Sequence, residues 1–207
     1  MPADDDLLGR LREGGAAVLA ELFAARRARL RRMVSWRLDP RLNGRVDPSD
    51  VLQEAFLDAQ RRLGEYLDKP SLPFDVWLRL LAGQRVVELH RQHLGAQKRS
   101  AGHEVSLDGR DWACASVPSL AAQLVGHLTS PSRAAYRAET AARLAAALGS
   151  MDPIDREVLV LRHFDELGNN EVAALLGLQK AAASNRYVRA LQRLRDILAT
   201  TPGLDAL

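Results

Sequence analysis

Apolar residues recur at steps of three and four along most of this chain, and no stretch alternates apolar and polar residues at every second position. The first pattern places apolar side chains on one face of an α-helix, whereas the second would be needed for a half-buried strand. Only 5% of the residues are aromatic, so the core must be built mainly from aliphatic side chains. We therefore expect an all-α protein.

The helical periodicity divides the chain into three blocks. Residues 5–99 and residues 133–199 carry it, whereas residues 100–132 lose it and collect Gly, Ser, Pro and Asp. Such a composition is typical of a linker. The sequence thus predicts two helical domains joined by a flexible linker.

The basic residues of this chain are almost all arginine. The chain has 29 basic and 26 acidic residues, and 26 of the basic ones are arginine. A guanidinium is permanently charged and binds phosphate, guanine or carboxylate through paired N–H groups. Because a GC-rich coding sequence produces the same bias, composition alone leaves a nucleic-acid partner open.

The last block contains a short helix, a glycine turn and a longer helix. The short helix covers Glu171 to Leu176, Gly177 ends it, and the second helix runs from about Lys180 to Leu198. The second helix has an apolar stripe made of Ala183, Tyr187, Ala190, Leu191, Leu194 and Leu198. Its opposite face collects Ala181, Ala182, Asn185, Arg186, Arg189, Gln192 and Arg193.

This arrangement is typical of a helix-turn-helix motif, whose second helix enters the major groove of DNA. Segment 179–195 holds Lys180 and four arginines and no acidic residue. An amphipathic surface helix with solvated arginines would show a similar basic face. The short preceding helix, the glycine turn and the absence of acids together favour DNA binding.

In the first block, the sequence predicts a helix that begins at Asp47-Pro48, with Asp47 as the N-cap and Pro48 in the first turn. Its apolar stripe consists of Leu52, Ala55, Phe56, Ala59, Leu63 and Tyr66, and the other side carries Asp50, Gln53, Glu54 and Leu57. After a loop from Asp68 to Pro73, the next predicted helix carries the apolar residues Phe74, Trp77, Leu78, Leu81, Val86 and Leu89.

Several classes of protein are disfavoured. One cysteine, Cys114, excludes an internal disulfide and a four-cysteine zinc module, and His90 and His93 have no further metal ligand nearby. No phosphate-binding glycine loop or hydrolase motif occurs, so we expect no enzyme, no cofactor, no metal and no small-molecule substrate. Without a membrane span or a signal peptide, we expect a cytoplasmic protein.

Three stretches resemble a bacterial sigma-70 family sigma factor of the small extracytoplasmic-function (ECF) type. DPSDVLQEAFLDA at 47–59 is similar to the family's D-x-x-Q-E-x-F helix, and FDVWLRLLAGQRVVELHR at 74–91 is similar to F-x-x-W-L-x-x-I-A-x-N-x-x-x-D-x-x-R. Residues 156–195 are similar to the closing helix-turn-helix. The resemblance implies region 2 at residues 5–99 and region 4 at residues 133–199, with residues 100–132 as the linker.

The resemblance also assigns roles to residues. By position, Asp50, Gln53 and Glu54 would bind the β′ clamp helices of core RNA polymerase. The residues implied to read and melt the −10 promoter element are Phe74, Arg79, Gln84, Arg85, Glu88 and Arg91. Helical spacing makes core packing the stronger interpretation for the rings of Phe74 and Trp77. Gln84 stands where the family usually has Asn, which leaves the −10 sequence open.

The closing motif implies residues that read the −35 element as duplex DNA, namely Lys180, Ala181, Ser184, Asn185, Arg186 and Arg189. Two helix caps depart from the family. Gln179 replaces the usual Ser or Thr before the recognition helix and is a weaker cap by about 1 kcal/mol. Gly168 replaces the usual Ser or Thr before the short helix, where Glu171 keeps the other half of a capping box.

The resemblance implies an initiation factor that brings core RNA polymerase to promoters, with the β′ clamp helices, the β flap and promoter DNA as partners. It leaves an anti-sigma factor open as a further partner. The alternative from another class is a helix-turn-helix transcriptional regulator that never binds core polymerase. Residues 47–91 discriminate between the two, since a repressor has no need of that combined motif.

Overall fold

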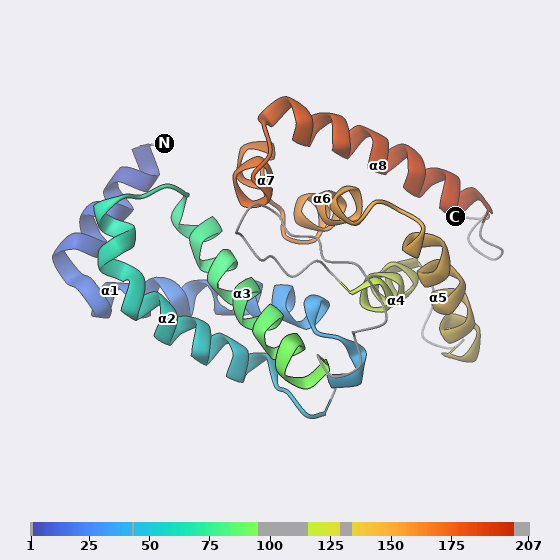
Figure 1. The fold of residues 1–207 in the computed structure, drawn as a ribbon, viewed down its shortest axis with the longest axis horizontal. Helices are drawn as coiled ribbons and strands as arrows, with labels where there is room; N and C mark the ends of the chain where they lie inside the picture. Colours follow the sequence, from blue (N-terminus) through green and yellow to red (C-terminus); the bar gives the residue numbers. More distant parts are fainter. Residues whose placement is uncertain (1, 43, 95–115, 129–133, 201–207) are drawn as a thin grey trace. The chain divides into compact units, whose positions relative to one another are not determined.

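The computed structural model describes residues 2–42, 44–94, 116–128 and 134–200. These residues form α-helices joined by turns and one short 3-10 helix, with no strand among them, so the expected all-α class is confirmed (Figure 1). The chain divides into two compact units. The first consists mainly of α1, α2 and α3, and the second mainly of α4 to α8.

The first unit packs three long helices against one another. They are α1 (Pro2–Arg37), α2 (Pro48–Asp68) and α3 (Phe74–Leu94), with the short 3-10 helix η1 (Pro40–Leu42) after α1. Each of the three helices contacts the other two (Figure 1). Helix α1 bends at Gly15, whose φ of 53° lies in the left-handed region that glycine adopts without steric cost.

Helix α2 begins as its sequence predicts. The Asp47 carboxylate accepts a hydrogen bond from the backbone N–H of Ser49 at 2.7 Å, and Pro48 occupies the first turn. The expected stripe faces the core, although Phe56 is only half-buried, 5.1 Å from the ring of Phe23. Tyr66 at the other end of the stripe is buried and donates its hydroxyl hydrogen to the carbonyl of Leu72. That bond anchors the loop between α2 and α3.

Among the residues that the structure describes, the second unit consists mainly of five helices. They are α4 (Val117–Leu128), α5 (Ala134–Gly149), α6 (Pro153–His163), α7 (Asn169–Leu176) and α8 (Lys180–Thr200). Helix α4 packs on α5, and α8 packs on α6 and, less extensively, on α5 (Figure 1). The core of this unit includes Leu144, Leu148, Val160 and Leu161, all fully buried.

Helix α4 corrects the expected linker. Residues 117–128 fall inside the predicted linker at 100–132, yet they form a helix that packs on α5. Leu120, Ala121 and Val125 are buried at helical spacing, an apolar pattern that the surrounding Gly, Ser and Pro residues concealed. Residues 100–115 and 129–132 of the expected linker, Cys114 included, lie outside the described residues.

Candidate nucleic-acid interface

The short helix, turn and long helix predicted for the last block are present. Helix α7 ends at Leu176, and Gly177 follows with a φ of 67°. The backbone N–H of Leu178 then donates to the carbonyl oxygen of Ala173 at 2.8 Å, a bond that closes the end of a helix around a left-handed glycine. Helix α8 starts two residues later. The predicted order of short helix, glycine turn and long helix is therefore confirmed.

The start of α7 is capped by Glu171. Its carboxylate accepts a hydrogen bond from the backbone N–H of Gly168 at 2.7 Å, which is the half of the capping box that the sequence retained. A further contact was not visible in the sequence. The side-chain amide of Asn169 donates to the carbonyl of Lys180 at 3.0 Å and so joins the first turn of α7 to the first turn of α8.

The buried face of α8 differs in part from the predicted stripe. Ala183, Ala190 and Ile197 are buried, whereas Leu191 is 36% exposed. Successive residues of a helix are separated by about 100° of rotation, so Leu191 falls beside the contact with α6 rather than inside it. The two alanines leave room for the backbone of α8 to lie close to α6.

The opposite face of α8 is open to solvent. Of the six residues expected to read the −35 element, Lys180, Ala181, Ser184, Asn185 and Arg189 are exposed. The first four occupy the two N-terminal turns, and the side chain of Arg189 is 62% exposed one turn further on. The helix therefore presents an amide, a hydroxyl and two cations beside a small alanine that permits close approach.

Arg186, the sixth residue, is engaged within the protein. Its Nη1 lies 2.6 Å from Oδ1 of Asp155 and 3.2 Å from Oδ1 of Asp152, both at the start of α6. Two carboxylates therefore already bind the guanidinium of Arg186, which the sequence did not predict. Periodicity could not reveal this, since the acids come from a different helix.

In the first unit, Asp50, Gln53 and Glu54 are all exposed on α2. Leu57, on the next turn of the same face, is 41% exposed. Helix α2 therefore presents two acids, an amide and an isobutyl group side by side. The sequence placed Leu57 on this face but did not single it out.

Two of the residues expected to handle the −10 element are buried. Phe74 is 1% exposed, with its ring 6.2 Å from that of Tyr66 and 5.9 Å from that of Trp77, and Arg79 is 5% exposed. Phe74 and Trp77 pack in the core, as their helical spacing predicted. Phe74 and Arg79 therefore do not form part of an exposed DNA surface here.

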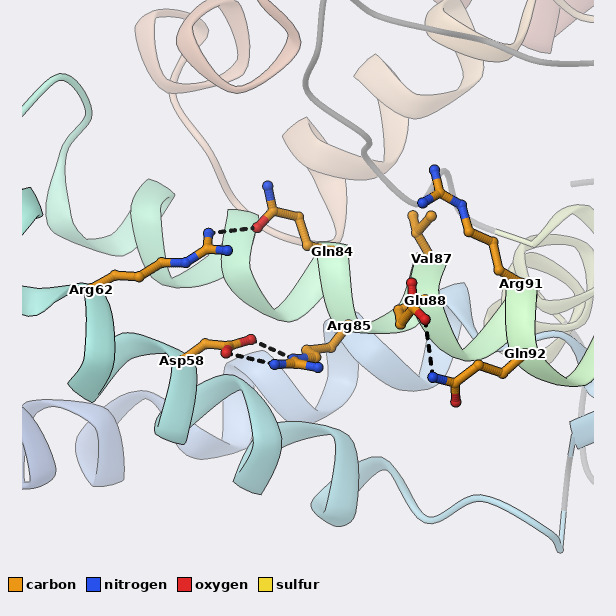
Figure 2. Close-up of a pocket in the computed structure, with 8 residues that line it drawn as sticks. All are labelled: Asp58, Arg62, Gln84, Arg85, Val87, Glu88, Arg91 and Gln92. Atoms are coloured by element: carbon orange, nitrogen blue, oxygen red, sulfur yellow. Dashed lines mark hydrogen bonds and ion pairs between the residues drawn. The ribbon is translucent and has the colours of Figure 1, made fainter.

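The remaining four residues lie around a groove of about 410 Å³ between α2 and α3 (Figure 2). Gln84, Arg85, Glu88 and Arg91 come from α3, and Asp58 and Arg62 face them from α2. The structure thus brings the four together along one side of α3.

Residues from α2 hold two of these side chains in place. Arg62 donates to the side-chain oxygen of Gln84 at 3.2 Å, which leaves the amide NH₂ of Gln84 as its free donor group. Arg85 binds Asp58 through two guanidinium nitrogens, one of them at 2.6 Å, in the paired geometry that suits a carboxylate (Figure 2). No sequence signal marked Asp58 or Arg62 as partners.

The pairing of Asp58 with Arg85 shifts the pKa values of both groups. Burial by itself raises the pKa of Asp58, but hydrogen bonds and charge from Arg85 and Arg61 lower it by more, so the pKa of Asp58 lies below its ordinary value. The hydrogen bond to Asp58 in turn raises the pKa of Arg85. Both groups are therefore charged at neutral pH.

Within the described ranges, no helix is both long and apolar enough to cross a membrane. Among those same residues, no three His, Cys, Asp or Glu side chains gather where they could hold a metal ion. His90 and His93 lie near the end of α3, and His93 is exposed.

A helix-turn-helix with a basic, acid-free recognition face defines a DNA-binding protein, and a separate three-helix unit carries a polar surface of its own. Residues 141–194 match the family model described as Sigma-70, region 4. That match lies mostly within the second unit.

Curated relatives extend the similarity to the first unit. The RNA polymerase sigma factor CnrH of Cupriavidus metallidurans is 27% identical over 154 residues, which is 74% of each chain. The ECF RNA polymerase sigma factor SigD of Mycobacterium tuberculosis is 29% identical over 151 residues, 73% of this chain and 63% of the relative. The solved structure of CnrH in complex with the cytosolic domain of CnrY has a similar fold, with a TM-score of 0.56 at 24% identity over 95% of this chain and 97% of that one.

The second unit carries a sigma-70 region 4, and this match and the relatives together support an ECF-type sigma-70 factor. The chain is a factor that directs transcription initiation by RNA polymerase.

Proposed function

We propose that this sigma factor binds core RNA polymerase through the exposed face of α2 and recognises promoters through α3 and α8. The observation that supports this division is that each unit presents its own polar surface. Asp50, Gln53, Glu54 and Leu57 form the α2 face, and Lys180, Ala181, Ser184, Asn185 and Arg189 form the α8 face.

The α8 face would read the −35 element as duplex DNA. Asn185 carries an amide that can pair with both N6 and N7 of adenine, and Lys180 and Arg189 carry the donors for guanine or phosphate. Ala181 and Ser184 are small enough to let α8 lie close to the base edges. Arg186 belongs to the same helix but is bound to Asp152 and Asp155.

The α3 groove would act on the −10 element, where single-stranded bases are bound by hydrogen bonds and stacking once the duplex opens. Gln84, Arg85, Glu88 and Arg91 line it, whereas Phe74 and Arg79 are assigned to the core. Because Arg62 occupies the oxygen of Gln84, the NH₂ group is left to bind an acceptor on a base.

The two promoter contacts are each expected to be weak. When a linker joins two binding modules, the second contact forms at a high effective concentration only if the two sites are correctly spaced. Selectivity for a promoter would then depend on the distance between its −35 and −10 elements as well as on their sequences.

The α2 face would bind the β′ clamp helices of core RNA polymerase. Its two carboxylates suit a basic partner surface, and the exposed Leu57 beside them adds an apolar contact. The β flap is proposed as a second polymerase contact, made by the second unit. We further propose an inhibitory protein partner, on the ground that CnrH was solved with the cytosolic domain of CnrY. All of these contacts belong to the cytoplasm, where the polymerase works.

Core binding tests the α2 assignment. Full-length Gln53→Ala/Glu54→Ala should bind purified core polymerase at least tenfold more weakly than the wild type, while its affinity for isolated −35 duplex stays the same. Gln60→Ala/Glu65→Ala is the matched control, because it removes the same two residue types from exposed positions about 10 Å and about 16 Å further along the same helix.

Equal core affinity in all three proteins would contradict the α2 assignment. If the wild type itself bound duplex DNA and did not bind core polymerase, the chain would instead act as a plain helix-turn-helix regulator.

A further inference from the structure

The start of α6 places two carboxylates against the basic face of α8. Asp152 is the N-cap of α6 and accepts hydrogen bonds from the backbone N–H groups of Ile154 and Asp155. Asp155, in the first turn, is only 16% exposed and lies beneath α8. Segment 179–195 contains no acid of its own, so these two residues supply the negative charge that the α8 sequence lacks.

Two α8 arginines meet these acids unequally. A single nitrogen of Arg186, Nη1, approaches both carboxylates, at 2.6 Å from Asp155 and 3.2 Å from Asp152. Nη2 of Arg189 lies 3.7 Å from the same Oδ1 of Asp155. The Arg189 side chain is 62% exposed and that of Arg186 is 24% exposed, so Arg186 is the more restrained of the two.

A carboxylate and a DNA phosphate compete for the same guanidinium, because both accept charge-assisted hydrogen bonds from it. Sequence-independent DNA affinity depends chiefly on how many phosphates the protein neutralises. An arginine already paired with an internal acid contributes less to that number. Base contacts from Asn185 or Lys180 are not affected by this pairing.

We infer that Asp152 and Asp155 restrain Arg186 and Arg189 and thereby suppress binding of α8 to DNA of arbitrary sequence. The two acids are specificity-determining residues, because they lower phosphate affinity everywhere and leave base contacts as the larger share of binding. The inference rests on the proposed role of α8 as the DNA-facing helix. It assigns a task to two residues that lie outside that helix.

The test measures binding of the full-length protein to a labelled duplex of random sequence by fluorescence anisotropy, between about 50 and 200 mM salt. Asp155→Asn should bind more tightly than the wild type at the lower salt concentration. The plot of log affinity against log salt should be steeper by about 0.9 for each arginine released. Such a slope corresponds to an additional loss of about 3.5-fold in affinity between the two salt concentrations for each arginine.

Two further variants separate this mechanism from a general change in charge. Asp196→Asn removes one exposed acid from the same unit without touching the cluster, and its slope should match the wild type. Arg186→Ala should weaken binding little in the wild-type background and several-fold more in the Asp155→Asn background. An equal cost in both backgrounds would overturn the inference.

A circular dichroism melt of each variant shows whether it is folded at the temperature of the assay. If Asp155→Asn does not fold, Asp152→Asn takes its place, since asparagine is as good an N-cap as aspartate and removes the other acid that binds Arg186. Its effect should have the same direction and a smaller size. Unchanged binding by every folded variant would refute the restraint, whereas a wild type without salt-dependent DNA binding would refute the proposed role of α8.

Discussion

Each unit contains an arginine that binds aspartate from a neighbouring helix, and the two arginines are bound in different ways. Arg85 of α3 donates hydrogen bonds from two guanidinium nitrogens to the single carboxylate of Asp58 of α2. Arg186 of α8 uses one nitrogen for two carboxylates of α6, Asp152 and Asp155. The acids nearest to the two arginines are similarly shielded, with exposed fractions of 13% for Asp58 and 16% for Asp155.

The difference lies in how firmly each guanidinium is held. Paired hydrogen bonds to one carboxylate are the stronger arrangement, so Arg85 acts first as a link between α2 and α3. Arg186 is held by a divided contact, which a phosphate can replace more easily. An arginine predicted to bind DNA can thus be a structural residue in one unit and a restrained DNA ligand in the other.

The largest effect is expected at Arg85. Arg85→Ala should lower the free energy of unfolding of the first unit by about 1.5–3 kcal/mol, because Asp58 keeps its charge and loses the paired donors. Hydrogen-exchange mass spectrometry on peptides from α2 and α3 would measure this without interference from the second unit. Arg62→Ala, which removes one exposed 3.2 Å contact, is the control and should change stability by less than about 0.5 kcal/mol.

The turn of the helix-turn-helix should show the next largest effect. Gly177→Ala places a side chain at a φ of 67° and should destabilise the α7–α8 turn by about 1–2 kcal/mol, although the space around it is open. Gly64 in the middle of α2 is also in open space but has ordinary helical backbone. Gly64→Ala should therefore stabilise α2 by about 0.5–1 kcal/mol. The same sign for both substitutions, in thermal or urea unfolding, would contradict this account.

Arg186 should matter less for stability than Arg85. Arg186→Ala should cost about 0.5–1 kcal/mol, because Asp152 is half exposed and regains water, while Asp155 keeps Arg189 at 3.7 Å. Exchange of α6 and α8 amides gives the measurement. A loss as large as that of Arg85→Ala would mean that the two clusters are equivalent and that Arg186 is held as firmly as Arg85.

The smallest effect is expected in acid. Since the pKa of Asp58 is lower in the folded protein than its unfolded value of about 3.9, its contribution to stability is complete above that pH and is lost as the pH falls through the folded pKa. Asp58→Asn should therefore flatten the decline of first-unit stability between about pH 5 and pH 2, a range covered by hydrogen exchange or denaturant titration. An unchanged pH profile would show that the pair with Arg85 does not persist in solution.

Features set by one helix and its neighbours in sequence were predictable. The Asp47 cap, the glycine turn at Gly177 and the exposed face of Asp50, Gln53 and Glu54 follow from local rules of capping and periodicity. Helix α4 was missed because Gly, Ser and Pro around it masked a short apolar pattern that only packing on α5 makes stable.

Contacts between helices distant in sequence were not predictable. Nothing near Arg85 or Arg186 in sequence indicates that Asp58 or Asp155 faces them, since each partner lies on a different helix. Burial of Arg79 likewise depends on tertiary packing that a helical wheel does not contain. The sequence therefore could not show which of the residues predicted to face DNA also make contacts within the fold.

Run-off transcription with core RNA polymerase tests the central claim most directly. The purified protein is added to core enzyme on fragmented genomic DNA, and the 5′ ends of the transcripts are mapped. We predict new, discrete start sites that share two upstream elements at a fixed spacing, and the loss of those starts with Gln53→Ala/Glu54→Ala. An absence of new starts, together with no binding to core polymerase, would contradict the account.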